Sequence, residues 1–565
     1  MFVSSRSFVV NQRIECDVCV IGAGPVGVAV ADRLSRSSLN VIVLESGGLE
    51  QSAEADALAM PEQNAHIGNI DQFQFTRQFG GNANAWLVRT DTSSRGVRLI
   101  SPTAGDIAAR PHIEDSGWPI LHDEMTPYVD DALSYFGLPP NGFSPEGWRK
   151  ADCADIETGD ARVDTAVFQF GDAREFVIGK KEKLAKDANV RFILNATVTD
   201  LDVSESDDHV TTVHYKSAEG DLFNVVARHV VIAAGGIGSV QILLNSTTRN
   251  PNGIGNTYDN VGRYFIDHPL IDGGDLVPFD RTSFERFEFY DMRLVDDVPI
   301  LGHFKISDQA LAAEHLASMS CMIFPREDDW RRNQHLSPRQ NRGFMASLLL
   351  REQILRRQFP TPRETFDAIV GIDGIVKRLL DSRRRPKANL GRGGWSKQRE
   401  HYGAFDRFHV LQIAEQFPHR ENRVYLSQEK DRFGVRRVAI DWKWHDDDIA
   451  ATVESQKAFA AMFASAGIGR YEIKSDNGVP SLVSSSTCHY MGTVRMSDDP
   501  RKGVVDANCR VHGIDNLYVA TSGVMPTGGY ANPTLLAVAF GLRVVDRIVQ
   551  ASQSVDLGEQ RSVAG

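Results

Sequence analysis

A glycine motif near the N-terminus constrains the fold of this chain more than any other feature. Gly22, Gly24 and Gly27 follow the pattern GxGxxG. Residues 16–21 before the motif are apolar except for Asp17, a composition typical of a parallel strand buried on both faces. Residues 26–34 after it carry apolar side chains at helical spacing. This context predicts a βαβ unit of the kind that binds dinucleotides.

Each glycine of the motif has its own physical role. Gly22 permits the tight turn, Gly24 lets the backbone approach a pyrophosphate, and Gly27 lets the helix pack closely on the strand. The helix begins at Pro25 and Val26, and its N-terminus presents free N–H groups and a positive dipole end to phosphates.

Residues 41–44 form a second apolar strand, and Glu45 stands at its end, about 20 residues after the motif. In dinucleotide-binding units an acidic residue at this place accepts hydrogen bonds from ribose hydroxyls. Its charge disfavours a 2′-phosphate, and Ser46 is expected beside it. A turn that merely requires glycines is the alternative interpretation. The motif by itself does not distinguish FAD from NAD.

The length and charge of the chain limit the function classes. The 565 residues exceed one simple core, so more than one domain is expected. The formal net charge of −12 argues against a nucleic-acid or anionic-membrane partner. The N-terminus lacks the pattern of a secretory signal, and no run of about 18 apolar residues predicts a membrane span. We therefore expect a cytoplasmic protein.

The cysteine pattern gives no metal site. Cys16 and Cys19 have CxxC spacing, but they fall within a predicted strand and no second pair completes a zinc site. We expect no metal and interpret the six cysteines as reduced thiols. Metal or redox use of the pair is the alternative.

Apolar periodicity predicts further elements along the chain. Residues 60–120 are rich in Gly, Asn, Asp and Thr and are predicted to be mostly loops. The predicted strands are residues 190–194, 196–203, 209–215 and 229–232, and the predicted helices are residues 123–136, 240–245 and 536–549.

One segment runs against the overall charge. Residues 351–387 contain ten Lys or Arg and five Asp or Glu in a polar, helical pattern. We expect a solvated helical arm within residues 340–405, and a lid or a subunit contact is the alternative. If the arm is a subunit contact, the protein forms a homo-oligomer.

Two clusters near the C-terminus carry the chemistry. His489 lies in a segment that continues through Gly492, Thr493, Arg495 and Met496. The second cluster, residues 517–535, ends in Asn532, Pro533 and Thr534 ahead of a predicted helix.

This pair of clusters resembles the glucose–methanol–choline (GMC) family of flavoenzymes, in which a His cluster is followed by a His or Asn at a helix start. Residues 234–244, 260–269 and 416–427 extend the resemblance, which is weakest over residues 100–185 and 280–405. Residues 79–86 and 531–535 look most like pyranose oxidases and their bacterial glycoside-oxidising relatives.

The resemblance implies an α/β protein, α+β overall. A Rossmann-like FAD-binding domain would be built from residues 12–100, 186–275 and 485–552. A substrate-binding domain with an antiparallel sheet and helices would comprise residues 101–185 and 276–484, and a disordered tail would span residues 553–565. Besides the residues already named, the implied FAD contacts are Gly80, Gly81, Asn82, Asn84, Ala85, Trp86, Val198, Ala234, Gly235, Thr521, Ser522, Asn532, Pro533 and Thr534. An ordinary Gly/Asn turn is the alternative for residues 80–84.

The resemblance also implies a mechanism. His489 would be the base, since imidazole titrates near working pH, and a hydride would pass to flavin N5. Asn532 would cap the helix that starts at Pro533 and would hold the same hydroxyl oxygen. A packed core histidine is the alternative for His489, and His268 is interpreted as structural.

Two departures from the family pattern matter. Thr521 stands where many members carry Asp, which puts one flavin contact in doubt. Ala85 stands where pyranose 2-oxidases attach the flavin to a His, and a methyl group cannot form that link. We therefore expect non-covalent FAD.

The resemblance implies oxidation of a secondary ring hydroxyl of a sugar or glycoside to a ketone, with oxygen or another acceptor reoxidising the flavin. Gln416 and Tyr490 are candidate substrate contacts, and strand polarity or packing is the alternative for each. A non-sugar alcohol such as a sterol or choline, a flavin-containing lyase without net redox chemistry, and a binding module are the competing functions.

Overall fold

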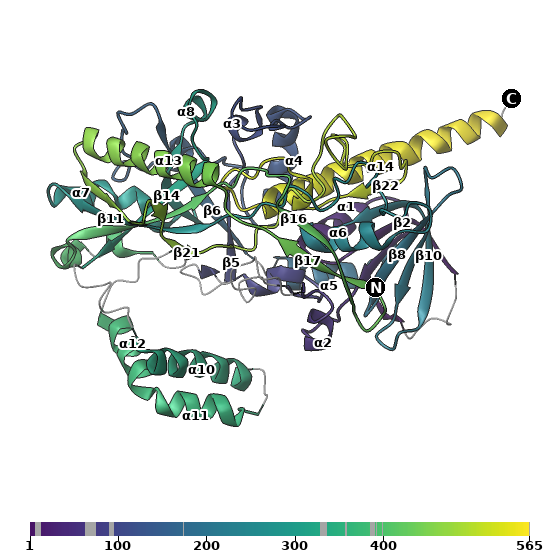
Figure 1. Cartoon of the computed structure of the whole chain (residues 1–565), viewed down its shortest axis with the longest axis horizontal. Helices are drawn as coiled ribbons and strands as arrows, with labels where there is room; N and C mark the ends of the chain where they lie inside the picture. The colour runs from purple at the N-terminus through teal and green to yellow at the C-terminus, as the bar shows by residue number, and fades with distance from the viewer. Residues whose placement is uncertain are drawn as a thin grey trace.

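The computed structural model describes the chain except residues 6–12, 63–74, 87, 90–94, 173–174, 328–335, 356–358, 385–389, 391–392, 398 and 564–565. Two large sheets lie side by side along its longest axis, and a helical arm projects from one end (Figure 1).

The first sheet contains the glycine motif. In the described part of the chain it has eight strands in the order β1-β7-β3-β2-β10-β9-β8, with β22 beside β10. All of its pairings are parallel except β8–β9 and β9–β10. The strands are β1 (Phe2–Ser4), β2 (Arg13–Ile21), β3 (Val41–Glu45), β7 (Val190–Leu194), β8 (Thr197–Val203), β9 (Val210–Lys216), β10 (Leu222–Ile232) and β22 (Leu517–Val519).

The predicted βαβ unit is confirmed. Helix α1 (Pro25–Leu34) connects β2 to β3, and the glycine motif lies between β2 and α1. Val18, Val20 and Val43 are fully buried, as expected for strands covered on both faces. Helix α14 (Thr534–Val563) packs along α1 and α4 (His122–Ser134), and its C-terminal end extends beyond the sheet (Figure 1).

The second sheet is antiparallel. Among the described residues it has ten strands in the order β18-β11-β15-β14-β13-β6-β5-β4, with β12 on β13 and β21 on β11. The strands are β4 (Val88–Arg89), β5 (Arg95–Leu99), β6 (Val163–Asp172), β11 (Leu270–Pro278), β12 (Met292–Val295), β13 (Val298–Ile306), β14 (Met319–Arg326), β15 (Arg407–Ala414), β18 (Gly469–Ile473) and β21 (Leu482–Ser484). The long helix α13 (Asp446–Ser465) packs against β14, β6 and β18.

Several shorter elements connect the sheets. Strands β16 (Arg423–Lys430) and β17 (Arg436–Asp441) pair with each other and pack against α6, and β19 (Ser475–Asp476) pairs with β20 (Val479–Pro480). The remaining helices of the body are α2 (Ala53–Asp56), α3 (Ala104–Ile107), α5 (Lys181–Ala185), α6 (Gly235–Asn245), α7 (Thr282–Arg286) and α8 (Asp308–Ala313), with short turns of helix η3 (Gly81–Ala85), η4 (Pro145–Trp148), η5 (Glu175–Lys180), η6 (Glu288–Tyr290), η7 (Trp395–Lys397), η8 (Arg399–Ala404) and η9 (Ser522–Val524).

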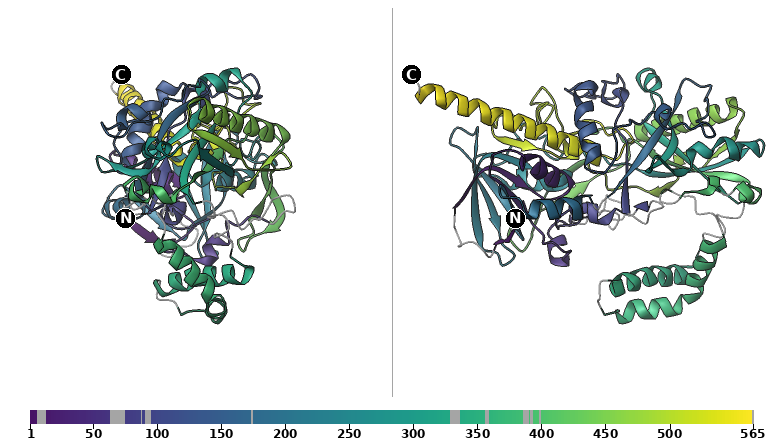
Figure 2. Two further views of the ribbon diagram at one scale, coloured as in Figure 1. Left: turned by 90° about the vertical axis from the view of Figure 1, so that its left-hand side faces the viewer. Right: turned by 180° about the vertical axis from the view of Figure 1, so that it is seen from behind.

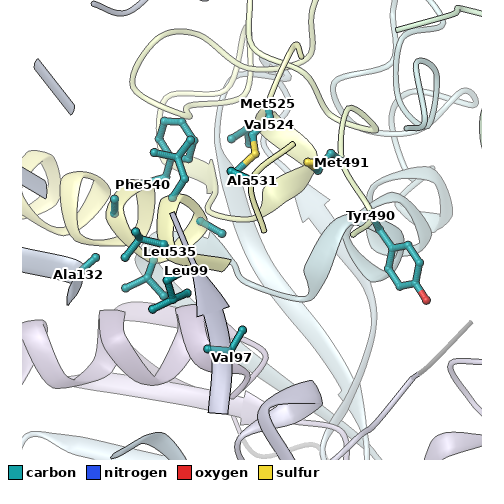
Figure 3. Packing of buried hydrophobic residues seen from close by; sticks show 14 of the residues in the cluster. Val97, Leu99, Ala132, Tyr490, Met491, Val524, Met525, Ala531, Leu535 and Phe540 are labelled. Carbon is teal, nitrogen blue, oxygen red and sulfur yellow. The ribbon is translucent and has the colours of Figure 1, made fainter. Parts of the chain in front are cut away.

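Strand β5 joins the two halves of the molecule. Figure 3 shows Val97 and Leu99 of β5 beside Leu535 of α14, with Ala132 of α4 nearby. We expected residues 12–100 to belong wholly to the cofactor-binding segment, but β4 and β5 pair with the second sheet. The Leu99 side chain is buried against α14, which packs on the cofactor-binding half, while the backbone of β5 pairs with the second sheet.

The structure corrects the ends of several predicted elements. Helix α6 begins at Gly235, five residues before the predicted start, and β10 begins at Leu222. Residues 553–563 continue helix α14, where a disordered tail was expected. That segment contains no proline, and its one glycine, Gly558, costs a helix only about 1 kcal/mol. The last two residues of the expected tail, 564–565, lie outside the described residues.

The predicted arm is helical. It consists of α10 (Pro338–Leu355), α11 (Pro362–Val370) and α12 (Ile372–Arg384), and it stands away from the body in all three views (Figures 1 and 2). Within the described residues, none of the helices has the length and apolar character needed to cross a bilayer.

Candidate active site

A cavity of about 550 Å³ lies where the glycine motif, strand β5 and the two C-terminal clusters meet. Its volume is in the range of small-molecule and cofactor sites. The predicted residues that line it are Gly22, Gly24, Pro25, Val26, Glu45, Ser46, Gly81, Asn82, Ala85, Trp86, Val198, Ala234, Gly235, His489, Tyr490, Thr521, Ser522, Asn532, Pro533 and Thr534.

Three residues predicted to contact the cofactor do not line this cavity. A Cβ on Gly27 would lie 1.9 Å from the Gly22 carbonyl oxygen, so Gly27 serves close helix packing. The Asn84 amide donates to the carbonyls of Phe79 and Gly81 at 3.0 and 2.9 Å and closes the turn. Gly80, at φ +89°, donates its N–H to the Ala23 carbonyl at 2.8 Å. These residues shape the cavity wall instead of facing it.

Three helix starts lie at the cavity. Gly24 precedes α1 and Ala234 precedes α6, and neither helix receives a capping hydrogen bond from its N-cap side chain. A Cβ on Gly24 would meet nothing within 4 Å, so this glycine faces open space. Helix α14 starts after Asn532 and Pro533. Uncapped N–H groups and positive dipole ends at one cavity fit an anionic dinucleotide.

Glu45 is held rigidly at the cavity wall. Its carboxylate accepts hydrogen bonds from the N–H groups of Ala23 and Gly47, each at 2.8 Å. Burial raises the pKa of Glu45, and these two bonds oppose that shift. Each oxygen keeps a lone pair for a further donor, which fits the ribose role predicted for this residue.

Arg77 is a cavity residue that the sequence reasoning missed. Its guanidinium donates to Ser46 Oγ at 3.0 Å and to Gln241 Oε1 at 3.3 Å. Burial lowers its pKa, and the charge of Glu45 opposes this shift. Arg77 therefore adds a cation beside Glu45, and no motif signalled it because it lies within residues 60–120, which were predicted to be mostly loops.

At the other end of the cavity, Asp267 organises the histidine segment. Its buried carboxylate accepts from the backbone N–H groups of His268 at 2.7 Å and His489 at 3.0 Å. It also accepts from Ser486 Oγ at 2.5 Å. Burial raises the pKa of Asp267 to about 6, although these hydrogen bonds favour the charged form. Asp267 thus holds two histidines in one place.

The hydrogen bonds of His489 select its tautomer. Thr487 donates its hydroxyl proton to the His268 carbonyl at 3.0 Å, so its oxygen is left to accept from His489 Nδ1 at 2.9 Å. His268 Nδ1 lies 2.9 Å from the same nitrogen. With the proton on Nδ1, the lone pair of His489 is on Nε2, which has no hydrogen-bond partner among the described residues.

The interpretation of His268 as merely structural was therefore incomplete. Burial, together with the positive charge of Arg98, lowers the pKa of His268 to about 3. Burial also places the pKa of His489 well below 6.5, assisted by His268 and Arg98. Both rings are neutral near pH 7, as a proton acceptor must be.

Arg98 and Asn532 form the opposite wall. Arg98 lies on β5 and is 5% exposed, and burial lowers its pKa to about 10, so it stays charged at neutral pH. Its Nη2 and Nε donate to Asn532 Oδ1 at 2.9 and 3.1 Å. Sequence reasoning missed Arg98 because an arginine in a short strand carries no motif of its own.

The two predicted substrate contacts differ in outcome. Gln416 is fully buried and does not line the cavity, since its amide accepts from Trp442 Nε1 at 2.6 Å and donates to the Lys443 carbonyl at 2.7 Å. That prediction is wrong, because these bonds commit the side chain to the protein interior. Tyr490 lines the cavity and stacks on Phe75.

A buried charge pair anchors the loop ahead of Asn532. Arg110 and Glu415 form two hydrogen bonds of 2.6 and 2.7 Å, and both side chains are at most 1% exposed. Glu415 also accepts from the Gly529 N–H at 3.2 Å. This pair connects the second sheet to the loop that carries Asn532.

The fold and the cavity together define a class of protein, a dinucleotide-binding oxidoreductase. A model for FAD dependent oxidoreductases matches residues 17–252, and one for GMC oxidoreductases matches residues 418–541. The chain is an FAD-dependent oxidoreductase of the GMC type that acts on CH–OH groups. The two matched regions contain the glycine motif and both C-terminal clusters.

Individual proteins show the same relationship. The chain is 23% identical to the fructose dehydrogenase large subunit of Gluconobacter japonicus over 95% of this chain and 98% of that one. It is 37% identical to a C-glycoside 3-oxidase of Arthrobacter globiformis, over 12% of this chain and 14% of the relative. Its fold is similar to the crystal structure of pyridoxine 4-oxidase from Mesorbium loti, with a TM-score of 0.53, 14% identity, and coverage of 94% and 99%.

Proposed function

We propose that this protein oxidises a secondary ring hydroxyl of a sugar or glycoside to a ketone. The observation that carries the proposal is that His489 lines one cavity with Asn532 and Arg98, while its Nε2 has no hydrogen-bond partner among the described residues. The sugar is supported by the names of two relatives, a fructose dehydrogenase and a C-glycoside 3-oxidase.

The chain's own residues supply the proton chemistry. His489 Nε2 accepts the hydroxyl proton as the carbon–oxygen double bond forms. Asn532 Oδ1 accepts two hydrogen bonds from the Arg98 guanidinium, so the Asn532 Nδ2 group is left to donate to the substrate oxygen. The positive charge of Arg98 stabilises the negative charge that develops on that oxygen. FAD, when bound, supplies the hydride acceptor and is reoxidised by oxygen or another acceptor.

The cavity offers groups suited to a polyhydroxylated ring. Trp86 and Tyr490 present aromatic surface, which can cover the apolar face of a sugar. Directional hydrogen bonds would come from Asn532 and His489.

The test is an anaerobic screen of flavin reduction. The purified holoenzyme is mixed with free sugars, glycosides, amino sugars, sterols and choline, and bleaching of the flavin absorbance is followed. Reduction by a sugar or glycoside, with a keto sugar as product, is expected. Reduction only by choline or a sterol would overturn the substrate class, and no reduction by any alcohol would favour a lyase.

A further inference from the structure

The helical arm, α10 to α12, carries a surface that the proposed function does not use. Among the described elements, these three helices make their extensive contacts only with one another. Figure 2 shows the arm standing clear of the body from two further directions. Its outer faces are therefore open to whatever the protein meets.

The inside of the arm is made of small residues. Gly343, Ala346, Gly371 and Gly374 are buried where the helices cross. A Cβ on Gly343 would lie 2.4 Å from the Gly371 Cα, so the backbones approach as closely as glycine permits. Phe344 is half-buried against Arg378, but most of the large apolar side chains of the arm lie outside these crossings.

Those large side chains point outward instead. Phe359 is 96% exposed, and Phe366 and Ile369 are each 65% exposed. On each of α11 and α12 the exposed apolar residues recur at helical spacing, so they lie on one face of that helix. The full set is Met345, Leu348, Leu349, Ile354, Phe359, Phe366, Ile369, Val370, Ile372, Val376, Leu379 and Leu380. An exposed apolar patch of this extent marks an interaction surface.

The charge of the arm indicates which surface it fits. Residues 351–387 contain twice as many basic as acidic residues, ten against five, in a chain of net charge −12. A symmetric contact between two arms would bring like charges together, since each patch would face its own copy. A bilayer with anionic headgroups attracts the basic side chains and accepts Phe, Leu and Ile below the headgroups.

We propose that the arm docks this enzyme on the surface of an anionic lipid bilayer. The apolar face of α11 and α12, with Phe359 at the end of the hairpin, enters the interface, and basic residues such as Arg351 and Arg363 contact headgroups. The proposal departs from the expectation drawn from net charge, because the basic residues are concentrated on one projecting element.

The test measures partition of the holoenzyme onto vesicles by sedimentation. One set of vesicles is phosphatidylcholine alone, and the other is phosphatidylcholine mixed with phosphatidylglycerol. Binding to the mixed vesicles, weak binding to the neutral ones and release by high salt are expected. No binding to the mixed vesicles would overturn the proposal.

Paired variants assign the binding to the arm. Phe366→Glu with Ile369→Glu should abolish partition, whereas Phe279→Glu, at a body residue that is 61% exposed, should not change it. Arg351→Glu with Arg363→Glu should reduce partition by about fivefold or more for each arginine. Arg470→Glu, an exposed arginine on the body, is the matched control.

All of these variants should keep bound FAD and the parent rate of flavin reduction, since the arm lies outside the cavity. Light scattering after size-exclusion chromatography measures the mass in solution. If the arm variants instead converted a dimer to a monomer, the surface would be a subunit contact and the proposal would be wrong. Equal partition of arm and control variants would also contradict it.

Discussion

Arg98 donates two hydrogen bonds to Asn532 Oδ1, from Nη2 at 2.9 Å and from Nε at 3.1 Å. A guanidinium only donates, so the amide of Asn532 must place its oxygen toward Arg98 and its NH₂ group elsewhere. The pair joins β5 of the second sheet to the start of α14, and it defines how the cavity can hold a hydroxyl oxygen.

The charge of Arg98 predicts a pH effect. Because Arg98 lowers the pKa of His489, removing the cation should raise that pKa. The parent rate of anaerobic flavin reduction should therefore stay constant down to well below pH 6.5, and the acid limb should move to higher pH in Arg98→Met. Arg98→Lys keeps the charge and should keep the limb at low pH. Identical acid limbs for Met and parent would contradict this electrostatic role.

Thr487 is predicted to hold the reactive tautomer of His489. Thr487→Val removes the oxygen that accepts from Nδ1, which should slow flavin reduction by about three- to tenfold, the worth of one hydrogen bond. Thr487→Ser keeps the hydroxyl and should reduce flavin near the parent rate, and stopped-flow spectroscopy measures all three. Equal rates of flavin reduction in Thr487→Val and Thr487→Ser would show that the Thr487 hydroxyl does not select the tautomer of His489.

The Arg110–Glu415 pair is predicted to stabilise the loop that precedes Asn532. Glu415→Gln leaves a buried cation without its carboxylate, which should destabilise the fold by about 3–5 kcal/mol. The double variant Arg110→Met, Glu415→Met should recover part of this loss, because the buried guanidinium that Glu415→Gln leaves unpaired is removed as well. Thermal unfolding of the holoenzymes measures the difference. A double variant less stable than Glu415→Gln would show that the charges are not the cause.

Non-covalent attachment of FAD follows from Ala85. This residue lines the cavity, and its methyl group has no atom that can bond to a flavin. Acid precipitation should leave the yellow colour in the supernatant, where mass spectrometry should identify FAD. A yellow pellet would mean that another residue forms a covalent link.

Sequence reasoning predicted the parts of the site that carry motifs. The glycine motif, Glu45 and the His489 and Asn532 clusters each combine residue type with a flanking strand or helix. Of these, Gly22, Gly24, Glu45, His489 and Asn532 line the cavity. Arg98 and Arg77 could not be found in this way, since their importance depends on partners distant in the chain. Thr487 is only two residues from His489, but its role as an acceptor depends on the distant His268 carbonyl, to which it donates. Arg98 is 434 residues from Asn532, and only the pairing of β5 with β6 brings it there.

Gln416 shows the opposite failure. It was chosen because a polar residue lies in a family-like stretch, yet Trp442 and Lys443 use its amide inside the protein. Burial of a polar side chain depends on available partners, which the local sequence does not show. The end of α14 was missed for a related reason, because the polar composition of residues 553–563 resembles a tail although the helix continues.

The most direct test of the central claim is the rate of anaerobic flavin reduction by the sugar or glycoside found in the screen. His489→Ala should keep FAD and lose about 10²–10⁴ in this rate, the usual contribution of a general base. Asn532→Ala should also slow reduction while retaining FAD. A His489→Ala variant that binds FAD and reduces it at the parent rate would contradict the account.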